Sequence, residues 1–201
     1  MFAVENKHNI ITMKKINLLV VFVLVAGGAF AQTWTLDKAH AKLGFGVTHL
    51  LVSDVEGSFN SFDAKITSSK EDFSDAVIEL TAEAASINTN NEGRDKHLKS
   101  PDFFDAEKFA QLTFKSKSFT KLEGKKYKLT GDLTLHGVTK PVTLDVTLNG
   151  TAVHPYNKKT IAGFKISGMI KRSDFIVGEK TPAAIVSDEV TIVANAEFVK
   201  G

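Results

Sequence analysis

Histidines are the side chains of this chain best suited to metal binding or acid–base chemistry, and five follow residue 31: His40, His49, His97, His136 and His154. No two of them stand at the spacing of a helical metal site, and no HExxH, GxSxG or phosphate-binding loop occurs. The chain has no cysteine, which excludes thiolate catalysis and cysteine metal sites. We expect structural or solvated histidines, with the alternative that His40 and His49 meet across the fold. We therefore assign no catalytic residue, no metal site and no cofactor.

One charged segment, NEGRDKHLKSPDFF (91–104), interrupts a chain that otherwise alternates apolar and polar residues. An asparagine at 90 or 91 suits a helix N-cap, and Lys96 and Lys99 suit a helix C-terminus. Pro101 ends this helix, and Ser100-Pro101 is typical of the start of a second one over 102–109. The segment predicts two short helices in succession.

The same segment holds the candidate polar contacts. Arg94 and His97, beside Lys96, could bind the polar or phosphorylated head group of a ligand by charge-assisted hydrogen bonds. The alternative is that Arg94 and Asp95 tie the helix to neighbouring loops, and this structural role is the one that we favour.

The segments that must position these groups are strands. Alternation with period two covers 41–49, 55–66, 75–84, 112–119, two strands within 126–150, 160–172 and 188–199. The alternation slips near Asn60-Ser61, which indicates a bulge or bend. These eight strands show no alternation with helices, so the pattern favours a sandwich or a closed antiparallel barrel.

The inside of an eight-stranded barrel is either filled by side chains or open to one small ligand. Small residues occur at five inward positions, Gly57, Gly131, Gly168, Ala194 and Ala196, and would leave room for a cavity. Glycines in strands also mark sharp bends around a packed core. The pattern alone leaves both interpretations open.

The N-terminus is typical of an export signal. Lys14 and Lys15 precede the apolar run LLVVFVLVA (18–26), and Ala29-Phe30-Ala31 fits a signal-peptidase site. We predict two parts, an N-terminal extension with a signal peptide over 1–31 and one domain over 32–201. No membrane span is expected after cleavage, and the periplasm is the expected location, with secretion from the cell left open.

Cleavage would also remove the basic excess. The first 31 residues hold three lysines and one glutamate, so the remaining 170 residues carry 22 basic and 22 acidic side chains. A neutral domain has no net charge with which to attract nucleic acid, so no nucleic-acid partner is expected.

Several short motifs resemble the YceI-like family of exported lipid- or polyisoprenoid-binding, lipocalin-like proteins. They are WTLDxAH (34–40), FxVxH (45–49), GSFxxF (57–62), SIxT (86–89), RDxHLKSxDFFD (94–105), LTFxS (112–116), GDLTLHGVTKPV (131–142), RSDF (172–175) and SDEV (187–190). Ile176 and Ala41 depart from the family, which commonly has glycine and serine there. Together the motifs span the predicted domain.

The resemblance implies a mainly β fold, an eight-stranded antiparallel lipocalin-like barrel with a short helical insert after the third strand. It implies an apolar tunnel for a long-chain isoprenoid or fatty lipid, and it suggests a homodimer. The expected tunnel lining is Phe45, Val47, Phe59, Phe62, Leu98, Phe103, Phe104, Phe114, Leu133, Leu135, Val146 and Ile166.

The function implied is binding of such a lipid for carriage, storage or sequestration in the cell envelope, without catalysis. Two alternatives remain at this point, an exported stress-related structural domain and an enzyme that acts on a lipid.

Overall fold

The structure, a computed structural model, describes residues 31–201. Its strands are β1 (Gln32–His49), β2 (Ser53–Phe59), β3 (Phe62–Ser68), β4 (Val77–Glu83), β5 (Ile87–Asn88), β6 (Gln111–Lys121), β7 (Lys126–Leu135), β8 (Val138–Val153), β9 (Thr160–Lys171) and β10 (Glu189–Lys200). Its helices are α1 (Glu92–Lys99) and the 3-10 turns η1 (Ala84–Ser86) and η2 (Arg172–Phe175). The predicted extension and signal peptide fall outside the described residues, apart from Ala31.

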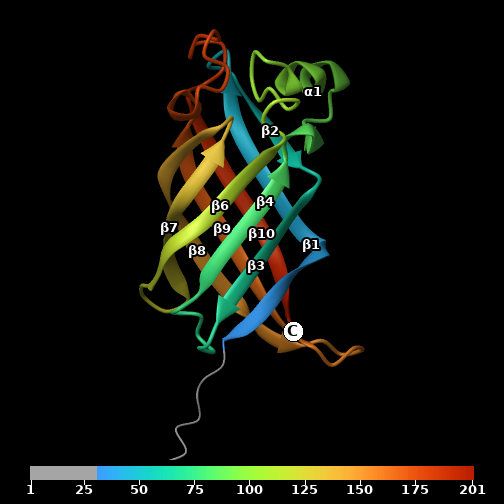
Figure 1. Cartoon of the computed structure of the whole chain (residues 1–201), viewed down its shortest axis with the longest axis vertical. Helices are drawn as coiled ribbons and strands as arrows, with labels where there is room; N and C mark the ends of the chain where they lie inside the picture. The colour runs from blue at the N-terminus through green and yellow to red at the C-terminus, as the bar shows by residue number, and fades with distance from the viewer. Residues whose placement is uncertain (1–30) are drawn as a thin grey trace, which may run out of the picture.

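The sheet closes into an antiparallel barrel because β10 pairs with β1 as well as with β9 (Figure 1). β2 pairs with the second half of β1 over Leu43–His49, and β3 pairs with its first residues over Gln32–Thr35. The two short strands therefore act as one bent strand, broken at the predicted position near Asn60-Ser61. Counted this way the barrel has eight strands, and the predicted fold class is confirmed.

Strand alternation places the apolar side chains inside. In β7, Tyr127, Leu129 and Leu135 are buried, whereas the lysines at 126 and 128 face outward and are exposed or half-buried. This is the period-two burial expected of a strand with one solvated face. The barrel wall is therefore built as the sequence predicts.

The helical insert covers the upper end of the barrel in Figure 1, after the third barrel strand. Asn91 caps α1, and its side-chain oxygen accepts a hydrogen bond from the Arg94 amide at 2.9 Å. The predicted second helix over 102–109 is wrong, because residues 101–104 and 106–108 form turns. The amides of Phe104 and Ala106 bond back to carbonyls of α1, and Asp105 adopts a φ of 45°, which is incompatible with a helix.

The lower end is filled by aromatic side chains. The β3–β4 loop (69–76) folds back at this end (Figure 1) and places Phe73, 1% exposed, in the interior. We call Trp34, Phe73, Phe119, Tyr127 and Phe164 the aromatic floor. Ring centroids lie 5.0 Å apart for Trp34 and Phe73, 5.1 Å for Phe73 and Phe164, and 4.6 Å for the stacked pair Phe119 and Tyr127.

Candidate functional site

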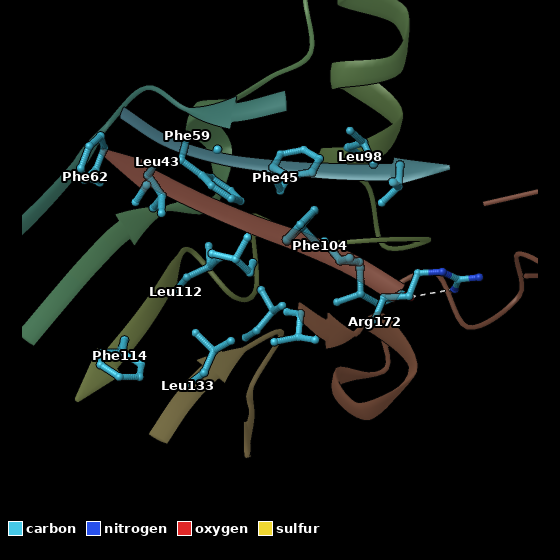
Figure 2. A pocket seen from close by; sticks show the side chains of 18 of the residues that line it. Leu43, Phe45, Phe59, Phe62, Leu98, Phe104, Leu112, Phe114, Leu133 and Arg172 are labelled. Atoms are coloured by element: carbon cyan, nitrogen blue, oxygen red, sulfur yellow. Dashed lines mark hydrogen bonds between the residues drawn. The ribbon is translucent and has the colours of Figure 1, made fainter. Parts of the chain in front are cut away.

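A cavity of about 620 Å³ occupies the upper part of the barrel. All eight barrel strands contribute to its wall, together with α1 and the segment 177–186. Figure 2 shows leucine and phenylalanine side chains from facing strands directed into this common space. The volume lies within the range of roughly 300–1,000 Å³ that is typical of small-molecule sites.

Most of the residues predicted to line a tunnel lie on this cavity. They are Phe45, Val47, Phe59, Phe62, Leu98, Phe103, Phe104, Phe114, Leu133, Leu135 and Ile166. Val146 does not line it. Its partner on β7 is Tyr127 of the aromatic floor, and Val146 is 3% exposed within the packed lower end.

Further lining residues went unassigned in the sequence. Leu43, Leu112, Val142 and Leu144 share the inward faces of recognised strands, so the period-two pattern could have found them. The segment 177–186 gave no such signal, because it is irregular. Its lining residues are Val177, Lys180, Thr181, Pro182, Ile185 and Val186.

The inward glycines do not open the cavity in the way that the sequence suggested. None of Gly57, Gly131 and Gly168 lines it, because Phe45 covers the first, Phe114 the second and Leu144 the third. Each glycine instead lets a neighbouring side chain lie flat against the wall. Ala194 and Ala196 do line the cavity.

Thr89 ties α1 to the barrel. The Arg94 Nε donates to Thr89 Oγ1 at 2.7 Å, and Nη2 donates to the Thr89 carbonyl at 2.8 Å. Thr89 in turn donates to Asp95 Oδ1 from its amide at 2.8 Å and from its hydroxyl at 2.5 Å. Arg94 is thus engaged in the structural role that we favoured, while it also lies on the cavity wall with His97.

His97 lies at the same end, and its side chain is 60% exposed. Its ring packs edge-on against Phe103, with centroids 5.0 Å apart, and its Nε2 lies 3.6 Å from Asp102 Oδ2. Together with Arg94 and Lys180 it gives the upper end of the cavity several cationic or polar groups.

Arg172 organises the other side of the upper end. It is 7% exposed, and its guanidinium donates to five backbone carbonyls, those of Val177, Gly178, Thr181, Val186 and Ser187, at 2.5 to 3.2 Å. Figure 2 shows this group extending away from the apolar side chains of the cavity. It therefore holds the irregular segment 177–186 in place as part of the wall.

Two carboxylates hold the β3–β4 loop at the opposite end. Hydrogen bonds from the Ser68 and Ser69 hydroxyls keep the pKa of Asp75 far below its usual value. The Lys121 ammonium lowers the pKa of Asp72 to about 2, and the Tyr127 hydroxyl donates to the Asp72 carbonyl at 2.6 Å.

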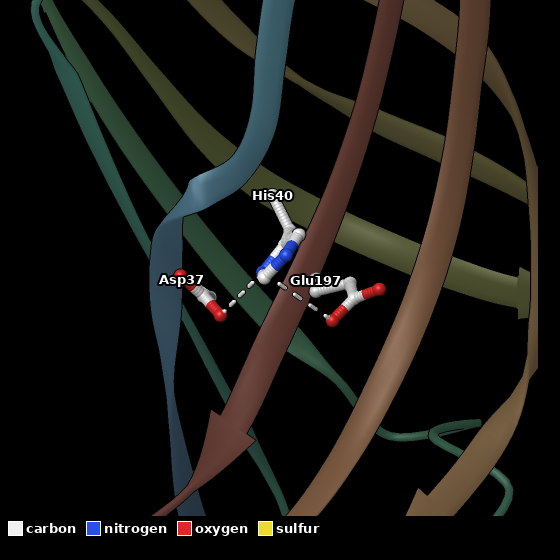
Figure 3. A group of neighbouring side chains, drawn as sticks. All are labelled: Asp37, His40 and Glu197. Atoms are coloured by element: carbon white, nitrogen blue, oxygen red, sulfur yellow. Dashed lines mark hydrogen bonds and ion pairs between the residues drawn. The ribbon is translucent and has the colours of Figure 1, made fainter. Parts of the chain in front are cut away.

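His40 and His49 do not meet. His49 lies on the cavity wall, whereas His40 lies outside it with Asp37 and Glu197, and the ligand atoms of these three lie within 4.8 Å of one another (Figure 3). The His40 Nδ1 is 2.9 Å from Asp37 Oδ2 and 4.0 Å from Glu197 Oε2. This contact with Asp37 raises the pKa of His40 and lowers that of Asp37. The short contact between His40 and Asp37 lies within β1, and Glu197 adds a longer contact from β10.

His136 is a structural histidine, the first of the two roles that the sequence left open. It is half-buried, its Nδ1 lies 3.3 Å from the Phe175 carbonyl, and Phe109 packs against its ring.

Within residues 31–201, no helix has the length and apolar character needed to cross a bilayer.

Comparisons with known proteins match nearly all of the described chain. The sequence model of the YceI-like domain matches residues 34–198. The UPF0312 protein SA2479 of Staphylococcus aureus is 38% identical over 169 residues, which cover 82% of this chain and 96% of that protein.

Solved structures share the fold. The crystal structure of Burkholderia cenocepacia BcnA has 28% identity and a TM-score of 0.73, with 81% of this chain and 98% of that chain covered. A polyisoprenoid-binding domain from Saccharophagus degradans has 17% identity and a TM-score of 0.61, with 84% and 98% covered.

Proposed function

The chain belongs to the YceI-like family, and from that premise we propose that it binds an isoprenoid or another long-chain amphiphilic lipid in the barrel cavity. The observation that carries the proposal is the cavity itself, which is walled by aliphatic and aromatic side chains from all eight strands. Removing an apolar chain from water into such a wall yields about 25 cal/mol per Å² of buried surface.

The distribution of polar groups supports an amphiphile rather than a wholly apolar ligand. Arg94, His97 and Lys180 lie on the wall at the end that carries α1, and the aromatic floor fills the other end. A chain would therefore lie toward the floor, with its polar group beside these three residues. The polyisoprenoid-binding description of the Saccharophagus degradans domain is consistent with this class of ligand.

Extraction of the purified protein with organic solvent, followed by mass spectrometry, tests the proposal. A recurrent long-chain compound is expected from the wild type and from Val193→Phe, whose altered side chain points outward. Ala194→Phe should carry none, because it puts a ring into the cavity from the adjacent position. Equal loading of the two variants would contradict the proposal.

The head-group role of Arg94 can be separated from its bonds to Thr89. A matched pair of ligands, a prenyl alcohol and its phosphate, is titrated into the wild type and into Arg94→Ala. If Arg94 binds the head group, the variant should lose about tenfold in affinity for the phosphate relative to the alcohol, the value of a charge-assisted hydrogen bond. Equal weakening of both would leave Arg94 with a structural role alone.

We also propose that the protein binds its ligand without chemical change and works in the periplasm, where it carries, stores or sequesters the lipid. Fractionation of cells that express the full chain, with N-terminal sequencing of the product, tests the location. Recovery of uncleaved protein from the cytoplasm would contradict it. Recovery of altered ligand from the extraction would favour an enzyme instead.

A further inference from the structure

The cavity has a floor. Four buried residues, Ala64, Phe114, Leu129 and Phe198, line the cavity and also belong to the apolar cluster that contains the aromatic floor, so they form the boundary between the hollow and the packed interior. None of the five aromatic residues of the floor lines the cavity, and all five are at most 6% exposed. A chain that enters from the α1 end therefore cannot pass through the barrel.

Phe73 is the member of the floor that comes from a loop. Its backbone has a φ of 58°, a conformation unfavourable for a bulky residue. Hydrogen bonds on both sides of Phe73 hold the loop in this conformation. The Ser68 and Ser69 hydroxyls donate to the Asp75 carboxylate, and the Tyr127 hydroxyl donates to the main-chain carbonyl of Asp72. The ring is fixed between Trp34 and Phe164, so the floor is a rigid end to the cavity.

The depth of the hollow can be estimated from β10, which lines it from Phe198 to Val190. This stretch is roughly 26 Å long at about 3.3 Å per residue. Because barrel strands tilt by about 35–45°, it corresponds to roughly 20 Å along the barrel axis. An extended hydrocarbon chain advances about 1.2 Å per backbone bond, as an extended polypeptide does. A hollow roughly 20 Å deep therefore holds a single extended chain of roughly sixteen bonds.

We propose that the aromatic floor sets the longest chain that this protein can enclose, close to a prenyl group of four isoprene units. This inference rests on the proposed function. A longer prenyl chain enters to the floor, and its remainder stays outside the barrel at the α1 end. Phe73 and Ala64 then determine the length of the enclosed chain. Phe73 closes the floor, and Ala64 lies on the cavity wall where the floor begins.

Binding of farnesol, geranylgeraniol and solanesol, measured by displacement of a fluorescent apolar probe, tests the proposal. Affinity should rise at least about tenfold from farnesol to geranylgeraniol and then change by less than about threefold for solanesol, because further units stay in water. A continued rise of similar size to solanesol would overturn the length limit. Absence of binding by all three would overturn the proposed function as well.

Two variants move the limit in opposite directions. Phe73→Ala opens the floor, so solanesol should gain affinity relative to geranylgeraniol. Ala64→Leu raises the floor, so geranylgeraniol should lose affinity while farnesol keeps it. Thermal unfolding checks that each variant is folded, and Ala64→Leu provides the test if Phe73→Ala is not. An unchanged order of affinities in a folded variant would contradict the assignment.

Discussion

Arg172 is a buried cation that is surrounded by carbonyl oxygens rather than by a carboxylate. The sequence marked it only as part of the RSDF motif, since neither periodicity nor charge pattern distinguishes a buried arginine from an exposed one. Its partners lie between 5 and 15 residues further along the chain, and the structure alone brings them together. Spatial assembly of this kind is outside what strand patterns predict.

Replacement of Arg172 by methionine should destabilise the protein by about 3 kcal/mol, because several buried carbonyls lose a charged donor at once. Urea unfolding measures the loss. Lys171→Met is the matched control, since the neighbouring lysine is exposed, and it should change stability little. Similar losses of stability in both variants would show that the hydrogen bonds from Arg172 to the five carbonyls are not the cause.

Asp75 should make the stability of the barrel sensitive to acid. Its folded pKa lies below the unfolded value of about 3.9, so its contribution is complete above that value and disappears as the pH falls toward the folded pKa. Asp75→Asn should therefore lower the melting temperature at neutral pH, and the difference from the wild type should shrink below about pH 4. Asp174→Asn, at the other end of the barrel, is the control. A difference that persists in acid would indicate a cause other than ionisation.

At the scale of elements, the glycines of the strands shape the cavity wall. A Cβ at Gly57 would overlap the ring of Phe45 and approach Thr89, whereas a Cβ at Gly46 would meet only Thr191, at 4.0 Å. Gly57→Ala should destabilise the protein by about 1–3 kcal/mol and displace Phe45 into the cavity. Gly46→Ala should do neither. Unfolding and ligand titration measure both effects, and equal behaviour of the two variants would contradict the wall-packing role of Gly57.

The β1–β2 hairpin turn contains leucines where glycine or asparagine is usual. Leu50 and Leu51 have φ values of 50° and 60°, and they are 51% and 72% exposed. Relief of the left-handed strain by Leu50→Asn together with Leu51→Gly should stabilise the protein by about 1–2 kcal/mol. Leu122→Asn, which also removes an exposed leucine but at an ordinary φ, should not. Urea unfolding measures the free energy of unfolding of both variants. Destabilisation of the double variant would contradict the strain argument.

The helical insert shows where local signals succeed and where they fail. The cap at Asn91 and the stop at Pro101 lie within a few residues of α1, so the sequence predicted that helix. The segment after it carried a plausible N-cap in Ser100, yet its amides bond to the carbonyls at the end of α1 instead. Tertiary packing of Phe103 and Phe104 on the barrel competes with helix propensity there, and a single sequence does not show that competition.

At the scale of the whole molecule, the barrel has a packed lower end and a hollow above it that extends along most of β10. The sequence predicted the wall, because inward and outward residues alternate, but left a filled and an open interior equally admissible. Which end is filled depends on Phe73, a loop residue outside the strand pattern, and on the stacking of Tyr127 and Phe119 across neighbouring strands. Val146 was misplaced for this reason, since it has the same inward orientation as the true lining residues.

This division predicts uneven local stability. Amides of α1 and of the segment 177–186 should exchange with solvent faster than amides of β6 and β7 beside the floor, because the upper segments pack against a hollow and the lower strands against rings. Native-state hydrogen exchange on the ligand-free protein measures the difference.

Filling the hollow should remove much of that difference. Ala194→Phe should slow exchange in α1 and in 177–186 without any ligand, because the new ring gives these segments a packed surface to close on. Val193→Phe, directed outward from the adjacent position, should leave the exchange pattern of the wild type. Equal exchange at the two ends of the wild type, or equal effects of the two variants, would mean that the cavity does not govern how the barrel opens.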